Sequence, residues 1–553
     1  MSAMTFMRDS ELIQCSWYEF ERKIFRALLH SGWTGLMFTS KSHDEGADIV
    51  GRPPNSEKYV IVQCKHTRSS TIGVKGIQDL INACQFYDTS RGIIATNAKL
   101  GKQAKMRMND VKNQFDFLEW DFKFLAKLDN SLREYSVNRK KPYIFQDSAI
   151  KEVLNNFESG SNNSLVMFAT GLGKSIVLAE IAHEYVVNKK KKVLLLADKI
   201  NLIEQLESSI WSQLPSSVDT RLWDGRRSPS SFEGVTVATQ QSVSSALSRG
   251  ERLPEFGLVM VDECHHALSP TFSELITDLN SEKLLGVTAT PWRGDEMQIT
   301  DLFGEPVATM GIVEGIERGY LSNVQYRMFA DNIDWDVVAE NSQNSMTIRD
   351  LNSKLFIPSR DEELASKIIH EWNTSGRPQT ITFCKGIDHA KRMAELLSAM
   401  GMSSRAIHSR NMPQAEKAKH IMDFKSGVYS NLIGVDILNE GIDVPDVEMV
   451  VFARVTHSRR IFIQQLGRGL RIHPDKQFVT VLDFVADVRR ISAGIRMNQE
   501  RRRMRSQEIY RGPSTDMVQF EGILHGNFVD SFLADAADLD ENDRIRLDFI
   551  QPL

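Results

Sequence analysis

The sequence predicts an α/β protein in which a small α/β unit precedes two tandem, doubly wound domains, each built on a parallel sheet. The first observation is a series of short apolar runs that alternate with helical patterns, because buried parallel strands read as nearly continuous apolar segments. The second is that glycine-rich and acidic motifs directly follow several of these runs. The third is length, since 553 residues are too many for one core.

Composition narrows the class of protein. With 41% hydrophobic and 25% charged residues, the chain can bury substantial cores, so wholesale disorder is excluded. A net charge of -5 leaves nucleic acid open as a partner, because contacts depend on where basic residues lie. No apolar run reaches the roughly 18 residues of a membrane span, and no signal peptide pattern opens the chain. We expect a soluble, cytoplasmic protein with no membrane partner.

The cysteines are widely separated and never form a C-x-x-C pair. Neither a disulfide framework nor a zinc finger is therefore predicted, and a reducing compartment fits. They are Cys15, Cys64, Cys84, Cys264 and Cys384.

The first unit is expected over residues 1–128, followed by a polar, basic linker at 129–141. It contains the helical stretch WYEFERKIFRALLHSGW, which includes Glu19. Two strand-like runs follow, separated by a Pro-Pro-Asn turn. A hairpin made of these runs would set Asp48 beside the second run.

In that second run, Gln63 and Lys65 share one face of the strand, because side chains alternate between faces. A carboxylate from Asp48, an amide oxygen and an ammonium group then converge. The oxygens suit Mg²⁺, with Mn²⁺ as the alternative ion, and the lysine can orient a water nucleophile or stabilise phosphorane charge. The competing interpretation is an edge hairpin whose polar residues face solvent.

The first parallel-sheet domain, expected over 142–310, contains the loop ATGLGKS between the strand LVMF and a helix. Backbone N–H groups of such a loop surround phosphates at a helix N-terminus. The residues expected at the nucleotide are Thr170, Gly171, Gly173, Lys174 and Ser175. Lys174 would neutralise phosphate charge and Ser175 would ligate Mg²⁺. The alternative is a glycine turn with a chance lysine, since Phe168 replaces the first glycine of the strict pattern.

Two adjacent carboxylates follow the later strand LVMVDECHHA. Asp262 would hold Mg²⁺ through water, and Glu263 would orient and deprotonate the attacking water. A zinc site at the Cys-His-His that follows is the weaker interpretation, because no fourth ligand stands at metal-like spacing.

These segments resemble motifs I and II of superfamily 2 helicases, in the D-E-x-H form. The resemblance implies two RecA-like domains, ATP as the nucleotide, and an adenine contact by Phe145 and Gln146. ADKINLIEQ resembles motif Ia, VATQQS the following strand-grip motif, and GVTATPWR motif III, with Thr288 and Thr290 linking hydrolysis to strand movement.

The second RecA-like domain is expected over 356–490, after a connector at 311–355. TITFCKGIDHA resembles motif IV, and VDILNEGIDVP resembles motif V and places Asp443 at the nucleotide. IQQLGRGLR resembles motif VI, which implies that Gln464, Arg468 and Arg471 face the nucleotide. On a helix these three share one face, and the arginines would act as fingers on the γ-phosphate. The tail at 491–553 is expected to be helical and acidic, and its Arg-rich segment to be solvated.

The residues of these helicase-like motifs are similar to those of the motor subunits of type I and type III restriction enzymes. Residues 15–110 resemble the Mrr-type branch of the PD-(D/E)xK nucleases, in which Gln replaces the usual acidic residue. That resemblance implies a restriction-endonuclease-like fold, the helix carboxylate Glu19, and DNA, expected to be double-stranded, as the partner.

The expected function is an ATP-dependent DNA helicase or translocase coupled to a Mg²⁺-dependent endonuclease, in prokaryotic defence against foreign DNA or in DNA processing. The alternative is a DNA-remodelling ATPase whose N-terminal domain binds DNA without cutting. An RNA helicase is disfavoured by the Mrr-like domain. Target choice would come from a separate protein partner, since the sequence shows no obvious target-recognition domain.

Overall fold

The computed structural model describes residues 6–7, 9–39, 46–229, 231–289, 299–329, 346–347, 361–408, 410, 412–435, 447–453, 470, 478–484, 497–504, 518–521 and 546–547. These ranges contain one five-stranded and two seven-stranded sheets, besides two small ones. The predicted class, an N-terminal α/β domain followed by two parallel-sheet domains, is confirmed. Within the same ranges, no helix combines the length and the apolar character that a membrane crossing requires.

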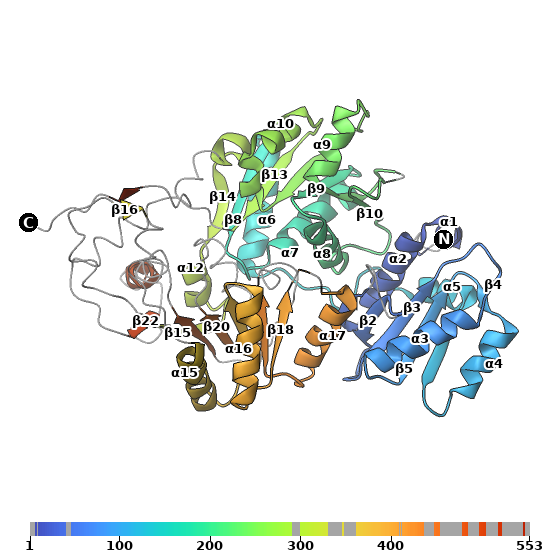
Figure 1. Ribbon diagram of the computed structural model, residues 1–553. Coiled ribbons are helices and arrows are strands. Elements are labelled where there is room, and N and C mark those ends of the chain that lie inside the picture. The colour runs from blue at the N-terminus through green and yellow to red at the C-terminus, as the bar shows by residue number, and fades with distance from the viewer. Residues whose placement is uncertain are drawn as a thin grey trace, which may run out of the picture. The chain divides into compact units, whose positions relative to one another are not determined.

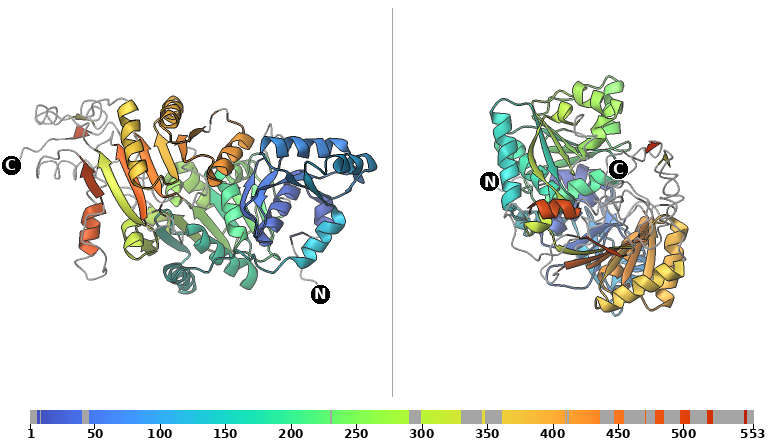
Figure 2. Two further views of the ribbon diagram at one scale, coloured as in Figure 1. Left: turned by 90° about the horizontal axis from the view of Figure 1, so that it is seen from below. Right: turned by 90° about the vertical axis from the view of Figure 1, so that its left-hand side faces the viewer.

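The N-terminal domain is built on a mixed sheet in the order β1-β2-β3-β5-β7. Its strands are β1 (Thr34–Phe38), β2 (Ile49–Arg52), β3 (Val60–Lys65), β5 (Arg91–Thr96) and β7 (Asp116–Trp120). The first three pair antiparallel, and β3, β5 and β7 run parallel. Around the sheet lie α1 (Asp9–Gln14), α2 (Trp17–His30), α3 (Val74–Phe86), α4 (Lys102–Asp110), α5 (Phe122–Ser131) and the short strands β4 (Thr71–Ile72) and β6 (Lys99–Leu100) (Figure 1 and Figure 2).

Helix α2 begins at a capping box. The Ser16 hydroxyl accepts from the Glu19 backbone N–H at 3.2 Å, and Glu19 Oε2 accepts from the Ser16 backbone N–H at 2.8 Å. The apolar side of the helix packs against β3, where Val62 and Cys64 join its core. The cap therefore fixes where the helix starts, and the apolar stripe fixes which side meets the sheet.

The predicted hairpin is confirmed. β2 pairs antiparallel with β3, with Ile49 opposite Val62. Asn55 in the turn has a φ of 61°, a left-handed conformation that asparagine tolerates better than most residues. This register places Asp48, just before β2, next to the carboxyl end of β3.

The second sheet has the order β10-β11-β9-β12-β13-β8-β14. Its strands are β8 (Asn163–Phe168), β9 (Val193–Ala197), β10 (Thr220–Trp223), β11 (Val235–Thr239), β12 (Leu258–Asp262), β13 (Leu284–Thr288) and β14 (Pro306–Met310). Its helices are α6 (Ile144–Glu158), α7 (Lys174–His183), α8 (Ile200–Trp211), α9 (Gln240–Ser248) and α10 (Pro270–Asp278). The apolar runs that predicted parallel strands form β8, β9, β11, β12 and β13, so that prediction is confirmed.

The third sheet has the order β18-β19-β17-β20-β21-β15-β22, and its strands run parallel. They are β15 (Asn323–Phe329), β17 (Thr380–Cys384), β18 (Ser404–His408), β19 (Asn431–Val435), β20 (Met449–Ala453), β21 (Phe478–Phe484) and β22 (Val518–Glu521). Its helices include α12 (Ile312–Glu317), α15 (Asp361–Thr374), α16 (Ile387–Ala399) and α17 (Gln414–Lys425). A separate pair, β16 (Met346–Thr347) and β23 (Arg546–Leu547), is antiparallel.

Two strands of this sheet come from parts of the chain that the sequence analysis places outside the domain. β15 falls in the expected connector at 311–355, and β22 falls in the expected tail at 491–553. β15 pairs with both β21 and β22, so its backbone groups are satisfied within the sheet.

The Arg-rich segment is not wholly solvated, contrary to expectation. Arg501 is only 8% exposed, and its Nε lies 2.6 Å from Glu317 Oε1 on α12. The solvated interpretation is wrong for this residue, because a buried cation needs a paired anion and finds one here.

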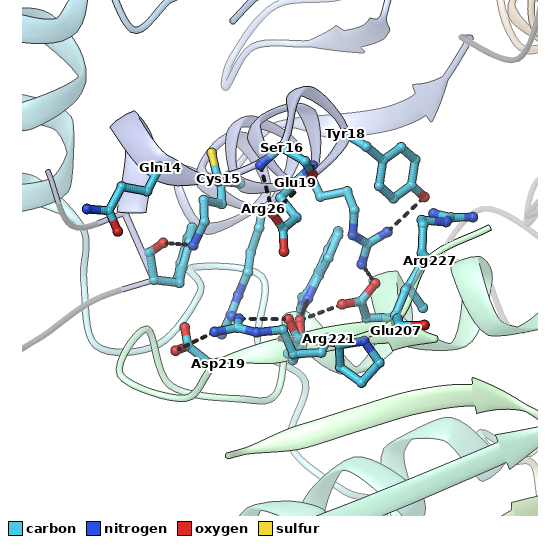
Figure 3. Close-up of a pocket in the computed structure, with 18 of the residues that line it drawn as sticks. Gln14, Cys15, Ser16, Tyr18, Glu19, Arg26, Glu207, Asp219, Arg221 and Arg227 are labelled. Carbon is cyan, nitrogen blue, oxygen red and sulfur yellow. Dashed lines mark hydrogen bonds and ion pairs between the residues drawn. The ribbon is translucent and has the colours of Figure 1, made fainter. Parts of the chain in front are cut away.

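A buried ionic network joins α2 to the first parallel-sheet domain (Figure 3). Arg22 pairs with Glu207 of α8, and their side chains are 7% and 0% exposed. Glu207 Oε1 also accepts from Thr220 Oγ1 at 2.5 Å. Arg26 donates to two backbone carbonyls of the same domain at 2.8 and 3.0 Å, and burial lowers the pKa of Arg26 to about 9. The N-terminal domain is therefore packed onto its neighbour through α2.

Glu207→Ala is expected to lower the free energy of unfolding by about 3–5 kcal/mol, because it leaves the buried Arg22 guanidinium uncompensated. Chemical denaturation of the whole chain measures the change. Glu251→Ala is the matched control, since Glu251 pairs with Arg249 at 2.7 Å on the surface, and an exposed pair contributes about 0–1 kcal/mol. Equal losses of unfolding free energy in both variants would contradict a stabilising role of the buried Arg22–Glu207 pair.

Candidate functional site

The predicted phosphate loop connects β8 to α7. Gly171 and Gly173 have φ values of 92° and 74°, which side-chain-bearing residues rarely adopt, so the loop requires glycine at both positions. Lys174 begins α7, and its Nζ lies 3.4 Å from the Phe168 carbonyl oxygen. The Thr170 hydroxyl is buried and has no hydrogen-bond partner among the described residues.

This loop fits a nucleotide phosphate. The backbone N–H groups at the start of α7 have no partner within the helix, and the helix dipole favours an anion there. The buried Thr170 hydroxyl is a further polar group that a bound phosphate or its Mg²⁺ shell can satisfy. Ser175, in the first turn of α7, follows directly after Lys174.

The acidic motif follows β12 of the same sheet. Asp262 is the last residue of that strand, and Glu263 has the left-handed values φ 48° and ψ 51°. Such a conformation costs about 1–3 kcal/mol in a residue other than glycine and is concentrated at functional sites. His265 Nδ1 lies 3.4 Å from Glu263 Oε2, and the His265 side chain is 2% exposed. Glu263 is thus held in a strained position beside a buried imidazole.

The remaining nucleotide-site residues divide into described and undescribed positions. Phe145 and Gln146 are buried at the start of α6, and Gln146 Oε1 accepts from the Tyr143 backbone N–H at 2.8 Å. Thr288 is buried at the end of β13. The positions outside the described residues are Thr290, Asp443, Gln464, Arg468 and Arg471.

In the N-terminal domain, Asp48 is fixed beside β3. It is 4% exposed, and its Oδ2 accepts from the Cys64 backbone N–H at 2.6 Å. Its own N–H donates to the Val62 carbonyl at 3.2 Å. The carboxylate therefore lies where the strand that contains Gln63 and Lys65 ends.

Gln63 is 1% exposed, and its Oε1 is buried without a hydrogen-bond partner in the described part of the chain. Leaving such an acceptor unsatisfied costs about 1–3 kcal/mol, which a bound cation would remove. The described residues contain no group of three or more His, Cys, Asp or Glu side chains arranged for a metal. The Asp48 carboxylate and the Gln63 amide oxygen are ligands of the kind that Mg²⁺ accepts, since this ion keeps several waters and needs only one or two protein oxygens.

Lys65 is the last residue of β3. Its Nζ lies 3.1 Å from Asp79 Oδ2 on α3, and the two side chains are 32% and 25% exposed. The ammonium group is thus partly accessible and held by a carboxylate that the sequence analysis did not identify.

Glu19 is not brought to this group. Its carboxylate is engaged in the capping box of α2, and Glu19 lines the cleft toward the neighbouring domain (Figure 3). Another carboxylate of α2, Glu21, is only 1% exposed, and its charge acts on the Cys64 thiol of β3. Burial first, and then the charges of Asp48 and Glu21, raise the pKa of the Cys64 thiol well above its usual value.

Every cysteine of the chain lies within the described residues. All five are free thiols, and four of them are buried.

Family comparisons match each domain. Residues 12–119 match the family described as "Restriction endonuclease". Residues 139–293 match "Type III restriction enzyme, res subunit", and residues 362–473 match "Helicase conserved C-terminal domain".

Curated relatives are similar over about two thirds of the chain. The type I restriction enzyme EcoAI endonuclease subunit of Escherichia coli is 27% identical over 390 residues, which cover 62% of this chain and 46% of that protein. The ATP-dependent DNA helicase uvsW of Enterobacteria phage T4 is 26% identical over 392 residues, 67% of this chain and 72% of that protein. The chain spans about half the length of several curated relatives that it matches.

A solved structure shares the fold over most of the chain. The structure titled "ATP-dependent Type ISP restriction-modification enzyme LlaBIII bound to DNA" covers 94% of this chain with a TM-score of 0.53 and 17% identity. The chain corresponds to 40% of that larger protein.

Proposed function

We propose that this chain, which is a superfamily 2 helicase with an N-terminal Mrr-type restriction endonuclease domain, is an ATP-driven DNA motor whose N-terminal domain cuts DNA with Mg²⁺. The observation that supports DNA cleavage is the state of Gln63, on the strand beside Asp48. Its amide oxygen is buried and has no hydrogen-bond partner among the described residues. We further propose a role in restriction of foreign DNA or in DNA processing in a prokaryotic cell.

In the proposed motor, the phosphate loop binds ATP, Lys174 neutralises phosphate charge, and Ser175 and Asp262 hold the accompanying Mg²⁺. Glu263 orients the attacking water and accepts its proton. The magnesium ion would supply electrostatic stabilisation of the β- and γ-phosphate oxygens. Gln464, Arg468 and Arg471 of the second helicase domain would complete the nucleotide site.

In the proposed nuclease, Asp48 and Gln63 hold Mg²⁺, or Mn²⁺ where the amide ligand weakens magnesium binding. The ion would lower the pKa of a bound water and stabilise phosphate charge. Lys65 places its ammonium beside the scissile phosphate. Glu21, rather than Glu19, is the helix carboxylate that we assign to this site.

We retain the proposed domain boundaries with one change. The nuclease domain spans 1–128 and the first helicase domain 142–310. The second helicase domain, proposed at 356–490, gains β15 and β22, because both are strands of its sheet.

The names of similar proteins support DNA as the substrate. One relative is an endonuclease subunit of a restriction enzyme, and the solved structure with the same fold is titled as bound to DNA. A separate protein partner would then supply target choice.

Purified protein incubated with linear, circular and single-stranded DNA, with and without ATP and Mg²⁺, tests the proposal. Mg²⁺-dependent products are expected from double-stranded DNA. DNA-stimulated ATP hydrolysis with no cleavage by either Mg²⁺ or Mn²⁺ would favour the remodelling ATPase instead.

Double-stranded DNA is expected to stimulate ATP hydrolysis, and the stimulation is expected to fall as salt rises. Contacts with DNA phosphates release counterions, and each contact contributes a slope of about -0.9 in a plot of log affinity against log salt. Phosphate release measured across a salt series checks this. Equal stimulation by RNA would contradict DNA as the substrate.

Glu21→Gln is expected to lower Mg²⁺-dependent cleavage by about 10- to 100-fold, the usual effect of losing a carboxylate that supports a metal site. Glu19→Gln is the matched control, because glutamine still completes a capping box. Single-turnover cleavage of linear DNA measures both. A larger loss in Glu19→Gln would restore the original assignment.

A further inference from the structure

An ion pair links the carboxyl end of β3 to α3 inside the nuclease domain. The Lys65 Nζ atom lies 3.1 Å from Asp79 Oδ2. The lysine stem lies near the same helix, because a Cβ added at Gly76 would stand 3.9 Å from Lys65 Cε. About one third of the Lys65 side chain is exposed, so the ammonium is oriented by Asp79 and still reachable from solvent.

The backbone of Asp79 contacts the other half of the site. Gly46, two residues before Asp48, has a φ of 83°, and a Cβ there would collide with the Asp79 carbonyl. Only glycine permits this approach. Asp79 therefore contacts both the loop that leads to Asp48 and the lysine at the end of β3.

We propose that Asp79 is a positioning residue of the nuclease site, whose carboxylate holds the Lys65 ammonium in place while its backbone sets the path of the loop before Asp48. This rests on the proposed nuclease function. A lysine side chain has a flexible four-carbon stem, and fixing it costs rotamer entropy. A carboxylate partner lowers that cost before DNA binds, because it restricts the ammonium to one region. Asp79 itself need not contact DNA or the metal.

Asp79→Asn is expected to reduce single-turnover cleavage of linear double-stranded DNA in Mg²⁺ by about 10- to 100-fold, as for other residues that orient a site. The apparent affinity for DNA and the ATPase rate are expected to stay near wild type. Asp79→Glu should recover part of the rate, since it restores a carboxylate. Glu57→Gln is the matched control, because its exposed pair with Arg52, at 3.3 Å, lies in the same domain away from the site. A faster rate in Asp79→Asn would overturn the proposal, because Asp79 would then restrain Lys65.

A double-mutant cycle separates positioning from general structural support. If Asp79 acts through the ammonium, adding Asp79→Asn to Lys65→Gln should cause little further loss of the residual single-turnover rate, measured at high protein concentration and long incubation. Additive losses would overturn the proposal. Thermal unfolding of each variant shows whether a loss of rate reflects misfolding.

A second measurement does not depend on cleavage. Acylation of Lys65 by an amine-reactive ester, followed by mass spectrometry, should be several-fold faster in Asp79→Asn, relative to the exposed Lys58 as an internal reference. Unchanged acylation would overturn the ion pair and the proposal with it. Faster acylation in a protein whose wild type cuts no DNA would instead refute the nuclease function and leave the ion pair intact.

Discussion

Glu263→Gln is expected to reduce ATP hydrolysis by at least about 100-fold while ATP still binds. The variant keeps the size of the side chain but removes the carboxylate that we propose as the acceptor of a proton from the attacking water, and general-base catalysis contributes about 10²–10⁴-fold. Phosphate release measures hydrolysis, and equilibrium binding of a fluorescent ATP analogue measures affinity. The strained backbone at this residue, with φ 48°, is consistent with a side chain held for chemistry.

Lys174→Ala extends this test, because loss of its charge should weaken both binding and hydrolysis. Glu233→Gln is the matched control for Glu263→Gln, since Glu233 is 74% exposed and pairs with Lys192 at 3.2 Å on the surface. Loss of nucleotide binding in a correctly folded Glu263→Gln variant would show that the carboxylate has a different role. Hydrolysis that persists in Glu263→Gln would place the base elsewhere.

Most strands could be predicted because parallel strands are buried on both sides. Segments such as LLLA in β9 and LVMV in β12 read as continuous apolar runs, because side chains on both faces of these strands are buried. β15 was missed because its sequence, NVQYRMF, lacks the continuous apolar run that marked the other strands, although its alternation of polar and apolar residues is typical of a half-buried strand. Its membership in the sheet depends on pairing with β21, from a segment far along the chain.

The difference between Glu19 and Glu21 was readable from helical spacing. Glu19 belongs to the polar stripe with Arg22 and Arg26, whereas Glu21 precedes Ile24 and Leu28 of the apolar stripe by three and seven residues. A carboxylate on the apolar stripe is unusual and is the stronger indication of a site. Resemblance to the family alone does not distinguish the two glutamates.

Asp79 could not be predicted in the same way. On α3 it reads as an ordinary polar residue, and its significance comes from the ion pair with Lys65 across the fold. Local sequence indicates residue types and faces, whereas contacts between distant elements require the packed structure.

Asp48→Ala and Lys65→Ala are expected to abolish DNA cleavage and to leave DNA-stimulated ATP hydrolysis near wild type. The former removes the proposed carboxylate ligand, and the latter removes the proposed cation at the scissile phosphate. Both belong to the proposed nuclease site, whose chemistry uses a metal ion and water and does not need ATP. Cleavage assays in Mg²⁺ and in Mn²⁺, paired with phosphate release on the same samples, measure both activities.

The control for Asp48 must preserve its structural contact, because its Oδ2 accepts the Cys64 backbone N–H at 2.6 Å and alanine would leave that buried donor unsatisfied. Asp48→Asn retains an acceptor oxygen but loses the charge that binds the metal, so it should fold like wild type and still fail to cut. Lys174→Ala is the reciprocal variant. It should lose ATP hydrolysis, and it should lose cleavage of long duplexes only if the motor delivers DNA to the nuclease. Cleavage that survives both Asp48→Asn and Lys65→Ala would place the nuclease centre elsewhere in the chain.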